Sequence, residues 1–85
     1  MNEQDIKATL KNFILHEYLP GEDAAALTDT TPLMTTGILD SIAVLKVVTF
    51  LEDKFGVTIE PHEAVVENLN TLSDMAQLVT SKKAA

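Results

Sequence analysis

A hydroxyl group and a carboxylate stand side by side in the segment GILDSIA, where Asp40 and Ser41 separate a turn-forming stretch from a long apolar run. A serine becomes a nucleophile when a base lies within hydrogen-bond reach and a third group orients that base. The segment lacks the G-x-S-x-G pattern of a nucleophile elbow, and the two histidines, His16 and His62, lie far from it in the sequence. We therefore expect no autonomous catalysis, and a small hydrolase is the least favoured alternative.

Two interpretations of Ser41 remain. A serine just before an apolar helical run commonly acts as the N-cap, whose side chain accepts a hydrogen bond from a backbone amide. Alternatively, Ser41 is exposed at a helix start so that another enzyme can attach a group to it. A phosphodiester is well tolerated there, because unpaired amides and the helix macrodipole favour an anion. Asp40 would suit a basic residue or a metal ion on the modifying enzyme.

Composition limits the classes of partner. Residues 1–85 are expected to form a single domain with one core. The formal net charge of -7 repels nucleic acids and anionic membranes and attracts proteins with basic patches. The chain has no cysteine, and two widely separated histidines do not predict a metal site. The first residues lack the features of a secretory signal, and no apolar segment approaches the roughly 20 residues that span a bilayer. We expect a cytoplasmic protein without membrane insertion.

The apolar residues recur with helical spacing almost throughout, which predicts an all-α fold. Residues 2–19 form an amphipathic helix with Asn2 as a plausible cap. Residues 20–37 carry two prolines, two glycines and many threonines, and predict a long loop with a short turn around residues 24–27. A loop this long in a small domain usually packs on the core or has a function. The residues expected to hold it there are Leu27, Leu33 and Met34.

The second predicted helix begins near Ser41 and ends at Gly56, a residue suited to a left-handed C-terminal conformation. The predicted buried stripe consists of Val44, Val48, Leu51 and Phe55. Four further apolar residues extend beyond one stripe: Ile42, Leu45, Val47 and Phe50. Either this helix lies at the centre of the bundle or it is partly exposed to something apolar. We expect a central position.

The remaining sequence predicts one short helix and one longer helix. The segment VTI is too short for an independent sheet, and Pro61 suits the first position of a short helix, PHEAVVENL. Thr71 is the predicted cap of the last helix, with Asp74 at the third position of a capping-box-like arrangement. The predicted apolar face of that helix consists of Leu72, Met75, Ala76 and Val79, and Lys82 and Lys83 suit its C-terminal dipole. The expected fold is a bundle of three longer helices and one short third helix, with a long loop between the first two.

GILDSI resembles the attachment motif of the acyl and peptidyl carrier proteins, which bear a 4'-phosphopantetheine arm. The resemblance covers nearly the whole chain, from the first amphipathic helix through TPLMTTGILDS and FLEDKFGVTI to TLSDMAQLV. It implies that a phosphopantetheinyl transferase modifies Ser41 with coenzyme A as donor, and that Asp40 belongs to the motif the transferase recognises. It also implies a non-catalytic carrier, which holds an acyl or aminoacyl group as a thioester and passes it between partner enzymes.

The surface of the second helix bears on the subtype of carrier. Carriers of fatty acid synthesis typically show acidic residues just after the serine, whereas Ala43 and Lys46 occupy that surface here. The pattern TPL...TGILDS, followed by a hydrophobic helix and FGVTI, is more similar to free-standing carriers that serve an adenylating ligase, or to modules of polyketide and nonribosomal peptide pathways. We expect such a specialised carrier, a monomer whose partners include that ligase and a downstream synthase or transferase.

Three residues that follow Ser41 are candidates for contact with a partner or cargo: Ile42, Leu45 and Lys46. For Ile42 and Leu45, packing against the loop around Leu33 and Ile38 is an equal alternative. A general carrier of fatty acid synthesis remains the alternative subtype. An unmodified acidic helical module that binds one partner is the alternative from another class, and it requires Ser41 only as a helix cap.

Overall fold

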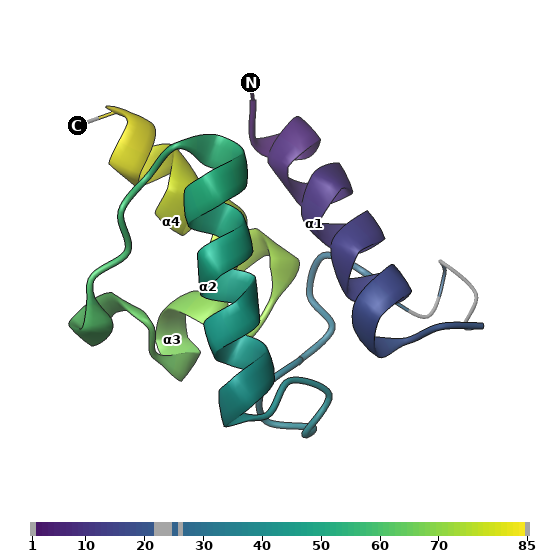
Figure 1. Cartoon of the computed structure of the whole chain (residues 1–85). Helices are drawn as coiled ribbons and strands as arrows, with labels where there is room; N and C mark the ends of the chain where they lie inside the picture. Colours follow the sequence, from purple (N-terminus) through teal and green to yellow (C-terminus); the bar gives the residue numbers. More distant parts are fainter. Residues whose placement is uncertain (1, 22–24, 26, 85) are drawn as a thin grey trace.

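The computed structural model describes residues 2–21, 25 and 27–84, and this part of the chain contains helices and no strand (Figure 1). The elements in chain order are α1 (Glu3–Tyr18), α2 (Ser41–Phe55), the 3-10 helix η2 (Pro61–Glu63), α3 (Val66–Leu69) and α4 (Leu72–Ala84). The predicted bundle of three longer helices and one short third helix is thus confirmed. None of the described helices is long and apolar enough to cross a membrane.

The ends of the helices follow local capping rules. The Asn2 side chain accepts a hydrogen bond from the Asp5 amide at 2.9 Å, and the Asp5 carboxylate accepts one from the Asn2 amide. At the start of α4, Thr71 Oγ1 accepts from the Asp74 amide at 3.0 Å, which confirms Thr71 as the cap. Gly56 ends α2 with a φ of 68°, the left-handed conformation that its position predicts.

The orientation of α2 differs from the prediction. Its buried side chains are Ala43, Val44, Val47, Leu51 and Phe55. Val48, predicted in the stripe, is only half-buried. Ile42 and Leu45 are 67% and 65% exposed, so the predicted central position of α2 is wrong. The helix that packs closely with two others is α4, which contacts both α1 and α3. Because Ile42 and Leu45 are three residues apart, they share one side of α2, and that side faces solvent.

The segment between α2 and α4 contains two short helices where the sequence predicts one. Pro61 begins η2 as expected, but Ala64 and Val65 leave helical geometry before α3 begins at Val66. Val65 has an extended backbone with φ -123° and ψ 164°, a conformation that β-branched residues favour. The interruption leaves Ala64 beside the start of α2, where it forms part of a groove described below.

The long loop is held on the core. Leu27 and Leu33 are fully buried and Met34 packs half-buried against them, as predicted. Residues 24 and 26 of the predicted turn at residues 24–27 lie outside the described residues. Asp29 is held at two points, since its carboxylate pairs with Lys7 at 3.4 Å and its carbonyl accepts from the Ser73 amide. From residue 27 on, the loop is thus held on the core until it reaches the start of α2, at the end of the molecule that also holds α3 (Figure 1).

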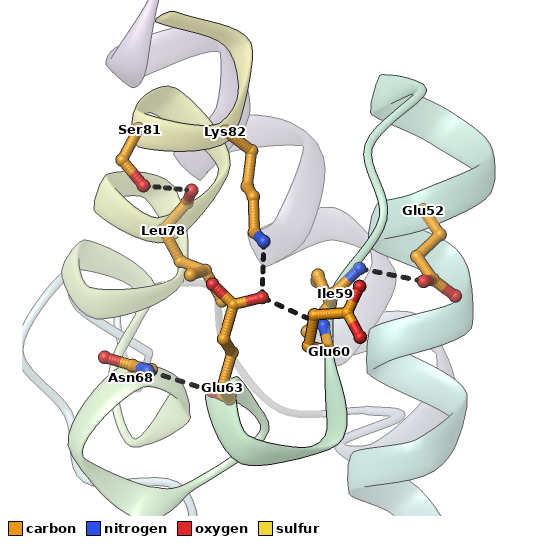
Figure 2. A network of polar contacts seen from close by, with 8 residues as sticks. All are labelled: Glu52, Ile59, Glu60, Glu63, Asn68, Leu78, Ser81 and Lys82. Carbon is orange, nitrogen blue, oxygen red and sulfur yellow. Dashed lines mark hydrogen bonds and ion pairs between the residues drawn. The ribbon is translucent and has the colours of Figure 1, made fainter. Parts of the chain in front are cut away.

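A network of polar contacts joins the segment that follows α2 to α2 itself and to α4 (Figure 2). The Ile59 amide donates to the Glu52 carboxylate at 2.9 Å. The Glu63 carboxylate accepts from the Glu60 amide and pairs with Lys82 of α4. This hydrogen bond from Lys82 lowers the pKa of Glu63 below its ordinary value. Lys83 Nζ also donates to the Phe55 carbonyl at 3.0 Å. The two lysines predicted near the last helix terminus thus join α4 to the chain around the end of α2.

Candidate functional site

The residue that caps α2 is Asp40, so the interpretation of Ser41 as the cap is wrong. Asp40 has the extended backbone of an N-cap, and its Oδ1 accepts a hydrogen bond from the Ala43 amide at 2.8 Å. Its carbonyl accepts the first helical bond from Val44. Both residues are able to cap, but a carboxylate also interacts favourably with the positive end of the macrodipole. Ser41 is therefore the first residue of the helix.

The hydroxyl of Ser41 is free. Its residue is exposed, and within the described part of the chain the hydroxyl has no hydrogen-bond partner. His16 and His62 are both exposed, and neither makes a described contact with Ser41. A hydroxyl without an adjacent base is a weak nucleophile. The arrangement thus presents Ser41 to an outside enzyme and supplies no described base of its own.

The turn before Asp40 is folded back on itself. Gly37 has a φ of 81°, a conformation that side chains rarely adopt, and its amide donates to the Met34 carbonyl at 3.2 Å. The Leu39 amide donates to the Leu33 carbonyl at 2.9 Å, and Leu39 itself is buried. The glycine of the motif therefore allows a tight turn that anchors Leu39 in the core, directly before the cap and the free hydroxyl.

Asn70, between α3 and α4, holds the same loop and was not among the residues singled out from the sequence. Its side-chain Oδ1 accepts hydrogen bonds from three successive amides, those of Leu33, Met34 and Thr35, at 3.2, 2.9 and 3.2 Å. Its backbone carbonyl accepts from the Leu33 amide at 2.7 Å. The only local signal is an asparagine next to the Thr71 cap, and this signal says nothing about a loop more than 30 residues earlier.

An open, mainly apolar groove of about 550 Å³ lies beside Ser41. Met34 and Leu39 of the loop form one side, Val44 and Leu45 of α2 form another, and Ala64 contributes from the segment between η2 and α3. The groove thus extends from the free hydroxyl across the end of the bundle. The positions of Val44 and Leu45 relative to Ser41 follow from helical spacing, but the part played by Ala64 depends on the interruption before α3.

A second hollow, of about 450 Å³, lies between the C-terminal end of α1 and the exposed side of α2. Ile42, Leu45 and Lys46 line it together with Phe13 and Tyr18. The three predicted contact residues therefore gather on one surface next to Ser41. Ile42 and Leu45 are largely open to solvent, so neither side chain is buried against the loop around Leu33 and Ile38.

The charge of Asp40, at the start of α2, affects the pKa of Tyr18 in α1. Its hydroxyl is buried and has no hydrogen-bond partner in the described residues. Burial raises the pKa of this phenol, and the carboxylates of Glu17 and Asp40 raise it further. Tyr18 therefore stays neutral at physiological pH and contributes its ring to the wall of the second hollow.

Three comparisons place these features among known proteins. A family model described as "Phosphopantetheine attachment site" matches residues 17–79, a range that includes Asp40 and Ser41. The "Probable acyl carrier protein PigG" of Serratia sp. (strain ATCC 39006) is 34% identical over 79 residues, which are 93% of this chain and 90% of the relative. The solved "Structure of KstB-PCP(apo)" superposes with a TM-score of 0.70 at 23% identity, and covers 96% of this chain and 90% of the other. This last likeness concerns the fold.

Proposed function

Since the chain belongs to the carrier-protein family that is defined by a phosphopantetheine attachment site, we propose that Ser41 bears a 4'-phosphopantetheine arm. The observation that carries this proposal is the division of roles at the start of α2. Asp40 provides the cap, so the Ser41 hydroxyl is left exposed and without a described partner. A serine needed only for helix stability would hold the bond that Asp40 holds.

The surroundings of Ser41 fit such an arm. In the described residues the amides of Ser41 and Ile42 have no hydrogen-bond partner, as expected for the first turn of a helix. Unpaired amides and the macrodipole favour a phosphodiester at this point. The groove beside Ser41 offers mainly apolar walls from Met34, Leu39 and Leu45 to the rest of an arm or to its cargo.

In the attachment step that we propose, a phosphopantetheinyl transferase supplies the base that the described surroundings of Ser41 lack. Ser41 Oγ forms a bond to the phosphorus next to the pantetheine part of coenzyme A. The pyrophosphate bond of coenzyme A breaks, adenosine 3',5'-diphosphate leaves, and the hydroxyl proton passes to the base of the transferase. Asp40 directly precedes Ser41 in the chain, where it suits a basic residue or a metal ion on the transferase.

When bound, the arm supplies a thiol that carries an acyl or aminoacyl group as a thioester. The chain itself contributes attachment, positioning and recognition. Tethering raises the effective concentration of the cargo at a partner's active site within reach of the arm. The protein acts in this proposal as a monomeric cytoplasmic carrier, with residues 1–85 as one domain.

We further propose that the carrier serves an adenylating ligase and a downstream synthase or transferase of specialised biosynthesis. The exposed side of α2 supports this subtype, because the first turn of the helix contains no acidic residue and Lys46 is exposed near Ile42 and Leu45. Such a surface fits a partner with an apolar pocket and a carboxylate opposite Lys46. A strongly basic partner surface would meet Lys46 unfavourably.

The intact mass of the purified protein tests the attachment. After incubation with coenzyme A, magnesium and a broad-specificity phosphopantetheinyl transferase, we expect a gain of one phosphopantetheine unit. Ser41→Ala is the matched control, because it removes only the free hydroxyl and leaves the Asp40 cap in place. No gain in the folded parent would reject the carrier proposal and favour the unmodified interaction module.

Reversal of one charge tests the subtype. In the arm-bearing protein, Lys46→Glu is expected to raise the apparent KM of the adenylating ligase for the carrier several-fold, and the effect should weaken with salt. Lys54→Glu makes the same charge change at the far end of α2, where Lys54 is also exposed. An equal effect of both variants would point to overall charge instead of docking beside Ser41.

A further inference from the structure

We propose that Asn70 is a positioning residue for the modification of Ser41. It holds the loop that precedes the serine in the shape that the modifying enzyme recognises. This inference rests on the proposed attachment at Ser41. It starts from one atom, Asn70 Oδ1, which accepts hydrogen bonds from the amides of Leu33, Met34 and Thr35 at 3.2, 2.9 and 3.2 Å.

The contacts form a continuous connection from Asn70 to the serine. The Leu33 carbonyl accepts from the Leu39 amide at 2.9 Å, and the Met34 carbonyl accepts from the Gly37 amide at 3.2 Å. Leu39 is buried and directly precedes Asp40 and Ser41. Residues 33–39 therefore form a hydrogen-bonded turn that Asn70 holds at one end and that leads into the cap of α2 at the other.

The same loop also shapes the groove beside Ser41. Met34, whose amide makes the shortest of the three bonds to Asn70 Oδ1, lines this groove opposite α2. An enzyme that approaches Ser41 meets the loop and the start of α2 together. Without Asn70 Oδ1, the Met34 and Thr35 amides lose their only described acceptor, whereas the Leu33 amide keeps the Asn70 carbonyl at 2.7 Å.

Asn68 provides a matched control from the same short segment. Its Nδ2 donates to the Glu63 carbonyl at 2.9 Å and so ties α3 to η2, away from the loop at residues 33–35. Asn68 and Asn70 are both half-buried. Replacement of either by alanine removes side-chain hydrogen bonds near α3, but only replacement of Asn70 releases the loop before Ser41.

The experiment combines amide hydrogen exchange with transferase kinetics on the unmodified protein. In Asn70→Ala we expect exchange of the Met34 and Thr35 amides to accelerate about tenfold, the scale of one lost hydrogen bond, with a smaller change at Leu33. The apparent KM of the transferase for the carrier should rise several-fold with little change in kcat. Asn70→Asp keeps an oxygen acceptor at the same place and should restore both values, whereas Asn68→Ala should leave both unchanged.

Three results would overturn the inference: an unchanged KM in Asn70→Ala, an equal rise in Asn68→Ala, or no rescue by Asn70→Asp. If Asn70→Ala does not fold by circular dichroism, Asn70→Gln gives the same test, because one added methylene displaces the oxygen. Failure of the proposed function has a different signature, since the parent itself would then gain no mass. A modified parent with unchanged Asn70 variants would overturn only the role of Asn70.

Discussion

The two ends of α2 use their polar groups in opposite ways. At the C-terminal end, Glu52 accepts from the Ile59 amide, and Lys83 donates to the Phe55 carbonyl. Between the two ends, Glu63 and Lys82 join η2 to α4 (Figure 2). At the N-terminal end, Asp40 makes the one side-chain capping bond found among the described residues. Ser41 next to it has a free hydroxyl, and Ile42 and Leu45 present apolar surface to solvent.

The difference shows which polar groups stabilise the fold and which remain free to bind or react with another molecule. Polar groups that pair within the protein stabilise the fold, but a paired group is not free to react with or bind another molecule. A free hydroxyl beside two exposed apolar residues has no evident structural use, and exposed apolar surface commonly marks an interaction site. We infer that the C-terminal end of α2 holds the bundle together, whereas the N-terminal end is kept open for the transferase and later partners.

The largest expected effect concerns the core at the C-terminal end. Phe55→Ala removes a buried ring that lies edge-on to Phe50, and it should lower the free energy of unfolding by about 3 to 5 kcal/mol. Ile42→Ala, at the N-terminal end of α2, should change the free energy of unfolding by about 0.5 kcal/mol or less. Urea denaturation measures both values. A similar loss in Ile42→Ala would mean that this side chain supports the fold, which would contradict its role as an open contact residue.

An intermediate effect should distinguish the cap from the hydroxyl next to it. Asp40→Ala removes the acceptor for the Ala43 amide and should lower the free energy of unfolding by about 1 kcal/mol, whereas Asp40→Asn should retain most of it. Ser41→Ala should leave it unchanged within about 0.5 kcal/mol. Thermal and urea unfolding of the three variants provide the measurement. If Ser41→Ala were as costly as Asp40→Ala, the proposed division of roles would be wrong.

The features that the sequence predicted correctly depend on neighbouring residues. The ends of α1, α2 and α4 follow from apolar spacing and from short-range caps such as Asn2 and Thr71. The cap of α2 was not predicted correctly: the sequence indicated Ser41, whereas Asp40 holds the bond, although both side chains can accept one from the helix start. The residue at which the folded-back turn ends determines which side chain is the cap. The turn ends at Leu39, because Leu39 is buried in the core.

The features that the sequence did not predict depend on contacts between distant segments. Val47 and Val48 are both apolar and adjacent, so the rotation of α2 against its neighbours decides which one is buried. The hydrogen bonds that the Asn70 side chain accepts join residues 35 to 37 positions apart, and no local pattern indicates them. For the site, the candidate serine and its exposed neighbours could be named in advance, whereas the groove and the residue that holds its loop required the three-dimensional arrangement.

The smallest expected effect is a pH dependence of the ion pair that joins η2 to α4. The hydrogen bond from Lys82 lowers the pKa of Glu63 from its ordinary value of 4.5. A lowered pKa in the folded state means that the charged carboxylate stabilises the fold above the unfolded pKa, and that this contribution is lost as the pH falls through the folded pKa. Glu63→Gln should therefore melt at a lower temperature than the parent at neutral pH, and the difference in melting temperature should shrink below pH 4.5.

Glu67→Gln serves as the control. It removes the charge of an exposed carboxylate of α3 that has no described ion pair. A difference that persists unchanged in acid would show that Glu63 acts through packing, and the ion pair would then have no part in holding η2 against α4.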